Sequence, residues 1–268
     1  MLALTLALAF AATTAQAQER ATDTGRTLQM VDALRARGDY DAAAIELRGW
    51  LERWLTVNWD SPTFLDELER MQDLMQKMVE MEALVQAADD DAGAARKLLS
   101  LIIDPAQPTP RTREQAMALR LLARHDPDVK ELLNAAFPAH LGRIEVDSPL
   151  LDENVLSFPL ENALAEVSSH ALPILRGAGA SELRVHLTML ENDKHNSLLE
   201  GTAMRSYAMH MSAEIVGADG ESIVRAATTT AVLGINPGNG AKYGMTKCAQ
   251  LIYQQLVDEL AKRAATTP

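Results

Sequence analysis

The sequence predicts an α+β protein in which a long helical region precedes a small sheet-and-helix region. Three observations support this prediction. Apolar residues recur at helical spacing from residue 26 to residue 140. Beyond residue 143 the pattern changes, and residues 183–189 alternate between apolar and polar side chains, as in a strand with one buried face. Finally, residues 244–263 carry one apolar stripe, which is typical of a closing amphipathic helix.

The composition limits the classes of partner. The chain has 268 residues, a net charge of -12 and only 4% aromatic residues. Because an acidic surface repels phosphate backbones and few rings are available to stack on bases, we expect no nucleic-acid partner. The single cysteine, Cys248, allows no internal disulfide and no zinc site built from cysteines, and we expect it in the core.

The first 17 residues have the pattern of a secretory signal peptide. They are apolar and small, and they end in Ala15-Gln16-Ala17, which matches the small-x-small motif before a signal peptidase cut. We therefore predict a periplasmic protein with Gln18 as its mature start and residues 18–25 as a flexible lead. No Lys or Arg precedes the apolar run, which leaves open an upstream start, and a buried N-terminal helix is the alternative.

Two further features bear on membrane attachment. No cysteine follows the predicted cut, so a lipid anchor at this start site is not expected. No other stretch reaches the length of apolar sequence that spans a bilayer, so we expect no integral membrane span.

The helical region, residues 26–140, begins with a predicted hairpin. Gly38 is expected to end the first helix and Asp39 to cap the second, which extends to about Leu55. The turn resembles that of a tetratricopeptide repeat, in which small residues allow close helix packing and a tyrosine, here Tyr40, seals the turn. No second copy follows at a period of about 34 residues, so the resemblance implies one helical hairpin and no solenoid.

More helices are expected in this region, at residues 63–88, 92–103, 112–124 and 127–137. The methionines of the first of these are expected in the core. The run Asp89-Asp90-Asp91 lacks the ligand spacing of a calcium-binding loop, so we expect it to end one helix and cap the next. The domain boundary is predicted at residues 138–142.

The second region, residues 143–264, is expected to have the order β-α-β-β-β-α, with both helices on one face of the sheet. The strands are expected at residues 143–147, 183–189, 204–216 and 222–233, and the helices at residues 159–176 and 244–263. The polar or glycine-rich segments 191–201 and 234–244 are expected to be mobile loops.

This order is similar to that of small bacterial envelope domains. They include the sheet-and-helix domains of outer-membrane assembly accessories, of penicillin-binding-protein activators and of the N-terminal part of TolB. The resemblance rests on the strand 183–189, the hairpin 204–233 and the closing helix, covers less than half of the chain, and departs from the group because no lipobox cysteine is present. It implies a non-enzymatic adaptor that works beside a larger envelope complex.

The sequence contains no motif from which catalytic, cofactor-binding or metal-binding residues can be predicted. His186 and His210 fall on neighbouring predicted strands, and Glu191 and Asp193 follow the first of them. These side chains would suit a metal site or, for His186, His210 and Glu191, an exported hydrolase. A solvated strand face is the alternative interpretation.

We therefore predict an exported, non-enzymatic interaction module for a cell-envelope complex, with a protein partner and no cofactor. Two alternatives remain. One is a carrier that holds a small molecule or lipid on the apolar surface between sheet and helices, and the other is the hydrolase. The sequence identifies neither the partner nor the oligomeric state.

Overall fold

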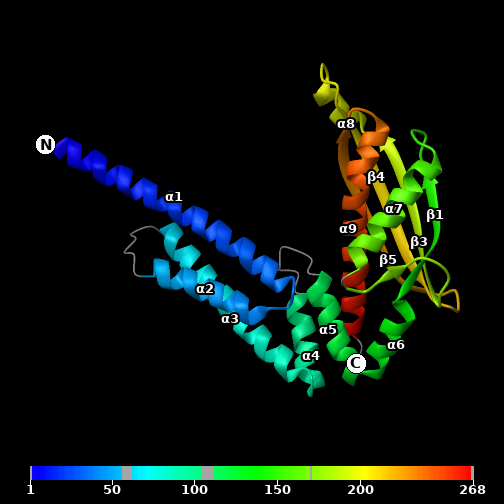
Figure 1. The fold of residues 1–268 in the computed structure, drawn as a ribbon, viewed down its shortest axis with the longest axis horizontal. Helices are drawn as coiled ribbons and strands as arrows, with labels where there is room; N and C mark the ends of the chain where they lie inside the picture. The colour runs from blue at the N-terminus through cyan, green and yellow to red at the C-terminus, as the bar shows by residue number, and fades with distance from the viewer. Residues whose placement is uncertain (1, 56–61, 104–111, 170, 267–268) are drawn as a thin grey trace. The chain divides into compact units, whose positions relative to one another are not determined.

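The structure, a computed structural model, describes residues 2–55, 62–103, 112–169 and 171–266. The chain divides into two compact units, residues 1–89 and residues 90–268. The first unit is helical, and the second contains further helices and a curled mixed sheet (Figure 1). This arrangement confirms the predicted α+β class with a helical region first. By their contacts, the helices that directly precede the sheet belong to the second unit.

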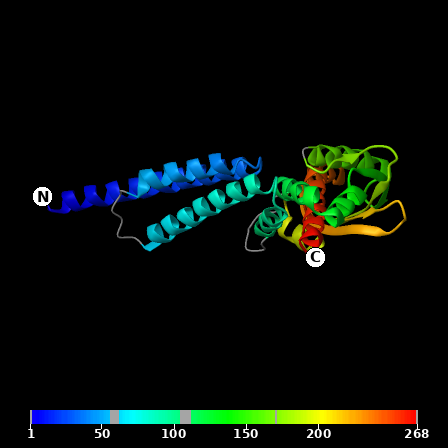
Figure 2. The same ribbon diagram turned by 90° about the horizontal axis from the view of Figure 1, so that it is seen from below.

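The first unit consists of α1 (Leu2–Arg35), α2 (Tyr40–Trp54) and α3 (Pro62–Ala87), which lie side by side (Figure 2). The predicted hairpin is confirmed. Gly38, with φ of 76°, takes the left-handed conformation that ends α1, and the Asp39 carboxylate accepts a hydrogen bond from the Ala42 amide at the start of α2. Tyr40 is fully buried behind this turn.

Residues 18–25 are helical, so the expectation of a flexible lead was wrong. They belong to α1, and their polar side chains contact the neighbouring helices. Arg20 forms an ion pair with Glu67 of α3, with Nε and Oε2 2.9 Å apart, and the Trp50 indole of α2 donates to Thr24 Oγ1 over 3.1 Å. The polar composition suggested solvent exposure, but these groups serve contacts between helices.

The predicted signal-peptide cut after Ala17 falls within α1, and export stays a prediction. Among the described residues, no helix combines the length and the apolar character needed to cross a membrane.

The second unit begins with α4 (Ala92–Ile102), α5 (Thr112–His125) and α6 (Pro127–Ala136). Asp91 caps α4 by accepting from the Gly93 amide over 2.8 Å, as the sequence predicts. Asp126 caps α6 by accepting from the amides of Asp128 and Val129. The segment between α4 and α5, residues 104–111, lies outside the described residues.

The sheet consists of β1 (Ala139–Asp147), β2 (Ile174–Leu175), β3 (Ser181–Glu191), β4 (Arg205–Val216) and β5 (Ser222–Gly234). The strand order is β2-β1-β3-β4-β5. β1 runs parallel to β2 and β3, whereas β3, β4 and β5 form an antiparallel meander. The two-residue strand β2 was not predicted, because so short a segment has no visible alternation.

Two long helices, α7 (Glu153–Ser168) and α9 (Pro237–Thr266), pack on one face of the sheet (Figure 1). α7 contacts β1, α9 contacts β4 and β5, and the two helices contact each other. The alternating apolar residues of β3 point toward this layer and are buried, as predicted: Leu183, Val185, Leu187 and Met189. The opposite face carries no described helix except near α8 (Asp193–Asn196) at one end.

The first of these helices, α7, has different bounds from the expected 159–176. It starts before Pro159, which lies inside it, and it ends at Ser168. The Ser168 hydroxyl then accepts a hydrogen bond from the Ile174 amide of β2 over 3.0 Å. Pro173 disfavours a helical conformation in Leu172, the residue before it, so the helix cannot continue to residue 176 as expected.

The closing helix α9 starts at Pro237 and not at Gly244, so the expected loop 234–244 is mostly helical. Asn236 accepts from the Asn239 amide over 2.9 Å, and Pro237 takes the first helical position. A Cβ at Gly244 would overlap Met209 Sδ and lie 2.6 Å from Val232 Cγ1, so this glycine allows close approach of α9 to the sheet. Glycines that suggested flexibility therefore serve packing.

The other expected loop, residues 191–201, is also partly helical. It contains α8 and the 3₁₀ helix η1 (Ser197–Leu199). Asn192 begins α8 by accepting from the His195 amide, and Asn196 accepts from the Ser206 amide of β4 over 2.6 Å. These amide side chains fold a polar segment against the sheet.

Candidate binding groove on the outer face of the sheet

The side chains that point away from α7 and α9 form what we call the outer face of the sheet. Strand register arranges them in rows. Glu145, His186, Ser212 and Ala227 are successive neighbours across β1, β3, β4 and β5. Arg184, Glu214 and Arg225 form the adjacent row, and Asp147, Thr188, His210 and Thr229 form the next. The alternation that buries one face thus produces an ordered polar surface on the other.

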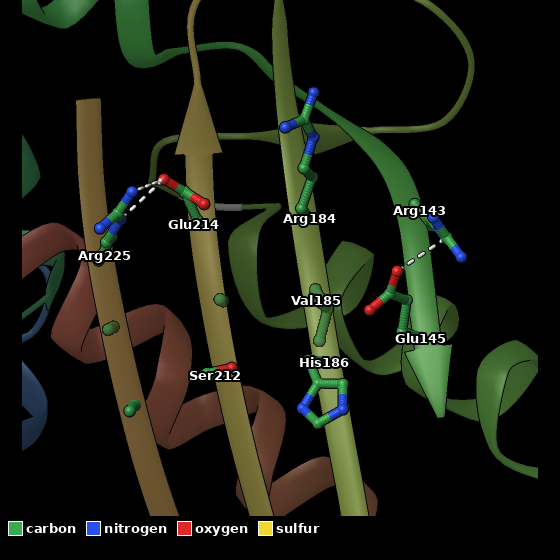
Figure 3. Close-up of a pocket in the computed structure, with 11 residues that line it drawn as sticks. Arg143, Glu145, Arg184, Val185, His186, Ser212, Glu214 and Arg225 are labelled. Carbon is green, nitrogen blue, oxygen red and sulfur yellow. Dashed lines mark hydrogen bonds and ion pairs between the residues drawn. The ribbon is translucent and has the colours of Figure 1, made fainter. Parts of the chain in front are cut away.

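The first two rows line a groove of about 590 Å³ (Figure 3). Arg143, on β1, also contributes to it. Two of the residues that line the groove, Ser212 and Ala227, are small, and the others include charged side chains of β1, β3, β4 and β5. The groove is therefore lined by arginine and carboxylate groups together with small side chains.

Each arginine of the groove is paired with a carboxylate. Arg143 Nε lies 3.0 Å from Glu145 Oε1, and Arg184 Nε lies 2.9 Å from Glu182 Oε2. Both pairs are largely exposed, and such pairs contribute little to stability in water. They leave charged groups of both signs at the surface, where a binding partner can contact them.

The third pair has the shortest contacts. Arg225 Nε and Nη2 each lie 2.7 Å from Glu214 Oε1, as the dashed lines in Figure 3 show. Hydrogen bonds from the side chains of Ser222 and Arg225 stabilise the charged carboxylate and lower the pKa of Glu214. At neutral pH this position is therefore an anion held between the arginines of β3 and β5.

The histidines proposed for a metal site do not face each other. His186 pairs with Ser212, whereas His210 pairs with Thr188 and lies one row away. His210 Nδ1 is 2.8 Å from the Thr229 hydroxyl.

The carboxylates proposed for the same site lie elsewhere. Glu191 ends β3 and pairs with Tyr207, and Asp193 is in α8. In the part of the chain that the structure describes, no three His, Cys, Asp or Glu side chains are grouped as metal ligands. The structure therefore does not bring together the residues that the sequence suggested.

Cys248 lies in the helix layer, on the other side of the sheet. It is fully buried in α9, which confirms its predicted place in the core. Burial raises the pKa of its thiol to about 11, so the thiol is uncharged at neutral pH and is not poised to act as a nucleophile.

The arginine and carboxylate rows could not be predicted from the sequence. Each of these residues occupies a polar position of an alternating strand, and the sequence pattern predicts that position. Their grouping depends on the parallel pairing of β1 with β3 and on the register of β3, β4 and β5. A single sequence does not contain that register.

Comparisons with known proteins leave the family open. No protein-family model matches the chain, and no curated protein matches it in sequence. Among solved structures, the chain is similar to one described as a "putative lipoprotein" from Caulobacter crescentus CB15, with 13% sequence identity and a TM-score of 0.27. The match covers 46% of this chain and 92% of that one. A likeness of this degree supports no inference about function.

Proposed function

We propose that this chain is an exported interaction module of the cell envelope, and that a protein partner binds in the outer-face groove. The observation that supports this most is the row Arg184–Glu214–Arg225, which sets alternating charges across three strands on a face that no described helix covers. Fixed charges of both signs favour selection of a partner by complementary charges.

The chemistry of the groove suits a polypeptide better than a nucleic acid. A phosphate backbone would need an excess of positive charge, but the arginines of the groove are matched by Glu145, Glu182 and Glu214. A protein segment with its own acidic and basic side chains can exchange partners with these pairs. The small side chains of Ser212 and Ala227, which line the groove, leave space for such a segment.

The carrier alternative has less structural support. A carrier was expected to hold its ligand between the sheet and the helices. In the structure this layer is filled by buried side chains, among them Met209, Met211, Ile252 and Leu256. The hydrolase alternative would rest on His186 and His210, which are in different rows.

The proposal is tested by crosslinking in intact cells, followed by affinity purification and mass spectrometry. We expect one envelope complex to be recovered with the wild-type chain, and N-terminal sequencing of the recovered chain to start at Gln18. Charge reversal in the groove by Arg184→Glu should reduce recovery of the partner by about tenfold or more, because like charges then face each other.

Lys130→Glu provides a matched control, since it makes the same change of charge on the exposed side of α6, away from the groove. We expect it to leave recovery unchanged. Equal losses with both variants, or full recovery with Arg184→Glu, would exclude the groove as the binding surface. Recovery of no partner at all, together with a hydrolytic activity lost in His186→Ala, would favour the enzyme.

A further inference from the structure

The two edges of the sheet differ in how they are protected against pairing with another strand. β2 forms part of one edge, is only two residues long and directly follows Pro173. The rest of that edge is β1 beyond His140, which carries the charged residues Arg143, Glu145 and Asp147. Short strands and prolines are common means of blocking an edge. β5 forms the other edge, is 13 residues long, and contains no proline and one charged residue, Arg225. The β5 edge therefore lacks protection by shortness, by proline or by a row of charges, although α9 packs on its inner face.

The backbone of β5 is also free on its outer side. Within the described residues, one hydrogen bond reaches this backbone from outside the β4–β5 ladder, and Arg263 donates it to the Ile223 carbonyl. From Val224 to Gly234, the amide and carbonyl groups that face away from β4 have no described partner. An unpaired edge of this length is a template for another strand.

We propose that a second copy of this chain pairs with this edge, so that two β5 strands run antiparallel and join two sheets into one. If the two-fold axis passes between the two Thr229 residues, Thr229 of one copy faces Thr229 of the other. Ala227 of each copy then faces Ala231 of the other. Arg225 then faces Leu233. No like charges meet, and the residues near the axis are small, so no bulky side chains collide across it.

The self-complementarity of β5 is what favours a second copy over an unrelated segment. Its central residues 227–231, Ala-Thr-Thr-Thr-Ala, read the same in both directions about Thr229. Each copy nevertheless has a net charge of -12, so two copies repel each other at long range. Salt screens this repulsion, and we expect the dimer to tighten as ionic strength rises, in contrast to a complex held by ion pairs.

Sedimentation of the purified protein over a range of concentrations and salt tests the proposal. We expect a dimer that Thr229→Lys weakens by about tenfold or more, because two ammonium groups then face each other across the axis. Thr188→Lys is the matched control, since it adds the same charge to the outer face of the interior strand β3. It should leave the dissociation constant unchanged.

A pair of double variants tests the register itself. In A227E/A231K each new carboxylate faces a new ammonium of the other copy, whereas in A227K/A231K like charges meet at both positions. We expect the first to dimerise at least about tenfold more tightly than the second. If Thr229→Lys fails to fold, which thermal melting would reveal, the two double variants still test whether the β5 strands pair in this register.

Several outcomes would overturn the proposal. A wild-type chain that remains monomeric at all concentrations and salt strengths would do so, as would equal behaviour of the two double variants. If Thr229→Lys and Thr188→Lys weaken the dimer equally, the added charge and not its place on the β5 edge would explain the loss. A monomer that crosslinks through β5 to a different protein would assign the edge to another occupant.

Discussion

The two faces of the sheet are made by the same strands but have opposite roles. Leu187 points toward α7 and α9 and is fully buried, whereas Thr188, the next residue, points to the outer face. The inner face is apolar and covered, and the outer face is polar and, away from α8, uncovered. We infer that stability depends mainly on the inner face, which leaves the outer face free to bind.

The largest effect is expected for truncation of the inner face. Leu187→Ala should lower the free energy of unfolding by about 2–5 kcal/mol, because it removes buried methyl groups and leaves a cavity. Thr188→Ala, on the outer face of the same strand, should change it by less than about 0.5 kcal/mol. Urea denaturation monitored by circular dichroism measures both. Equal costs would contradict the division between the faces.

The inner face was also the part of the sheet that the sequence predicted well. Residues 183–189 alternate strictly, and alternation with a period of two determines which side chains are buried whatever the neighbouring strands are. The outer face was predicted to be polar, but the row Arg184–Glu214–Arg225 was not. Such rows depend on the register between strands that are distant in sequence. That register cannot be predicted from one sequence.

The helix bounds show a second limit of the sequence. The segment 234–244 contains several glycines and a proline, so it was interpreted as a flexible loop. In the structure Pro237 begins α9, and Gly244 allows the helix to approach Met209 and Val232. Glycine at a close contact and glycine in a loop look alike until the surface opposite the glycine is known.

A second, smaller effect is expected where α9 is joined to the chain before β2. The Tyr253 hydroxyl donates to the Leu172 carbonyl over 2.9 Å and accepts from the Leu172 amide over 2.8 Å, and the ring is buried. Tyr253→Phe leaves both backbone groups without these bonds and should cost about 1–3 kcal/mol in urea denaturation. Tyr243→Phe, on the same helix but 71% exposed, is the control and should be close to neutral.

The same buried groups predict a loss of stability at alkaline pH. Burial raises the pKa of Cys248 from 9.0 to about 11 and that of Tyr253 from 10.0 to about 12. Because both values are raised, the stability that depends on the neutral groups is complete below their ordinary pKa values and is lost as pH rises through the folded ones. We expect Tyr253→Phe to decline less steeply than wild type above about pH 10. Parallel declines would contradict this assignment.

The smallest effect is expected on the outer face, at the pair Glu214 and Arg225. Glu214→Gln should cost less than about 0.5 kcal/mol at neutral pH, because Arg225 is 73% exposed and solvent screens the pair. The pKa of Glu214 is lowered by the hydrogen bonds from Ser222 and Arg225, so its contribution is present above the ordinary carboxyl pKa and is lost as pH falls through the folded value. Denaturation curves of wild type and variant should therefore converge in acid.

A double-mutant cycle with Arg225→Gln separates the ion pair from other changes at the two positions. A coupling of several kcal/mol would show that the outer face also stabilises the fold, and the division between the faces would fail. A small coupling, with partner recovery nonetheless reduced in Glu214→Gln, would locate binding and stability on opposite sides of one sheet. The comparison is sharpest at this pair, because the same two side chains then give a small effect in one measurement and a large effect in the other.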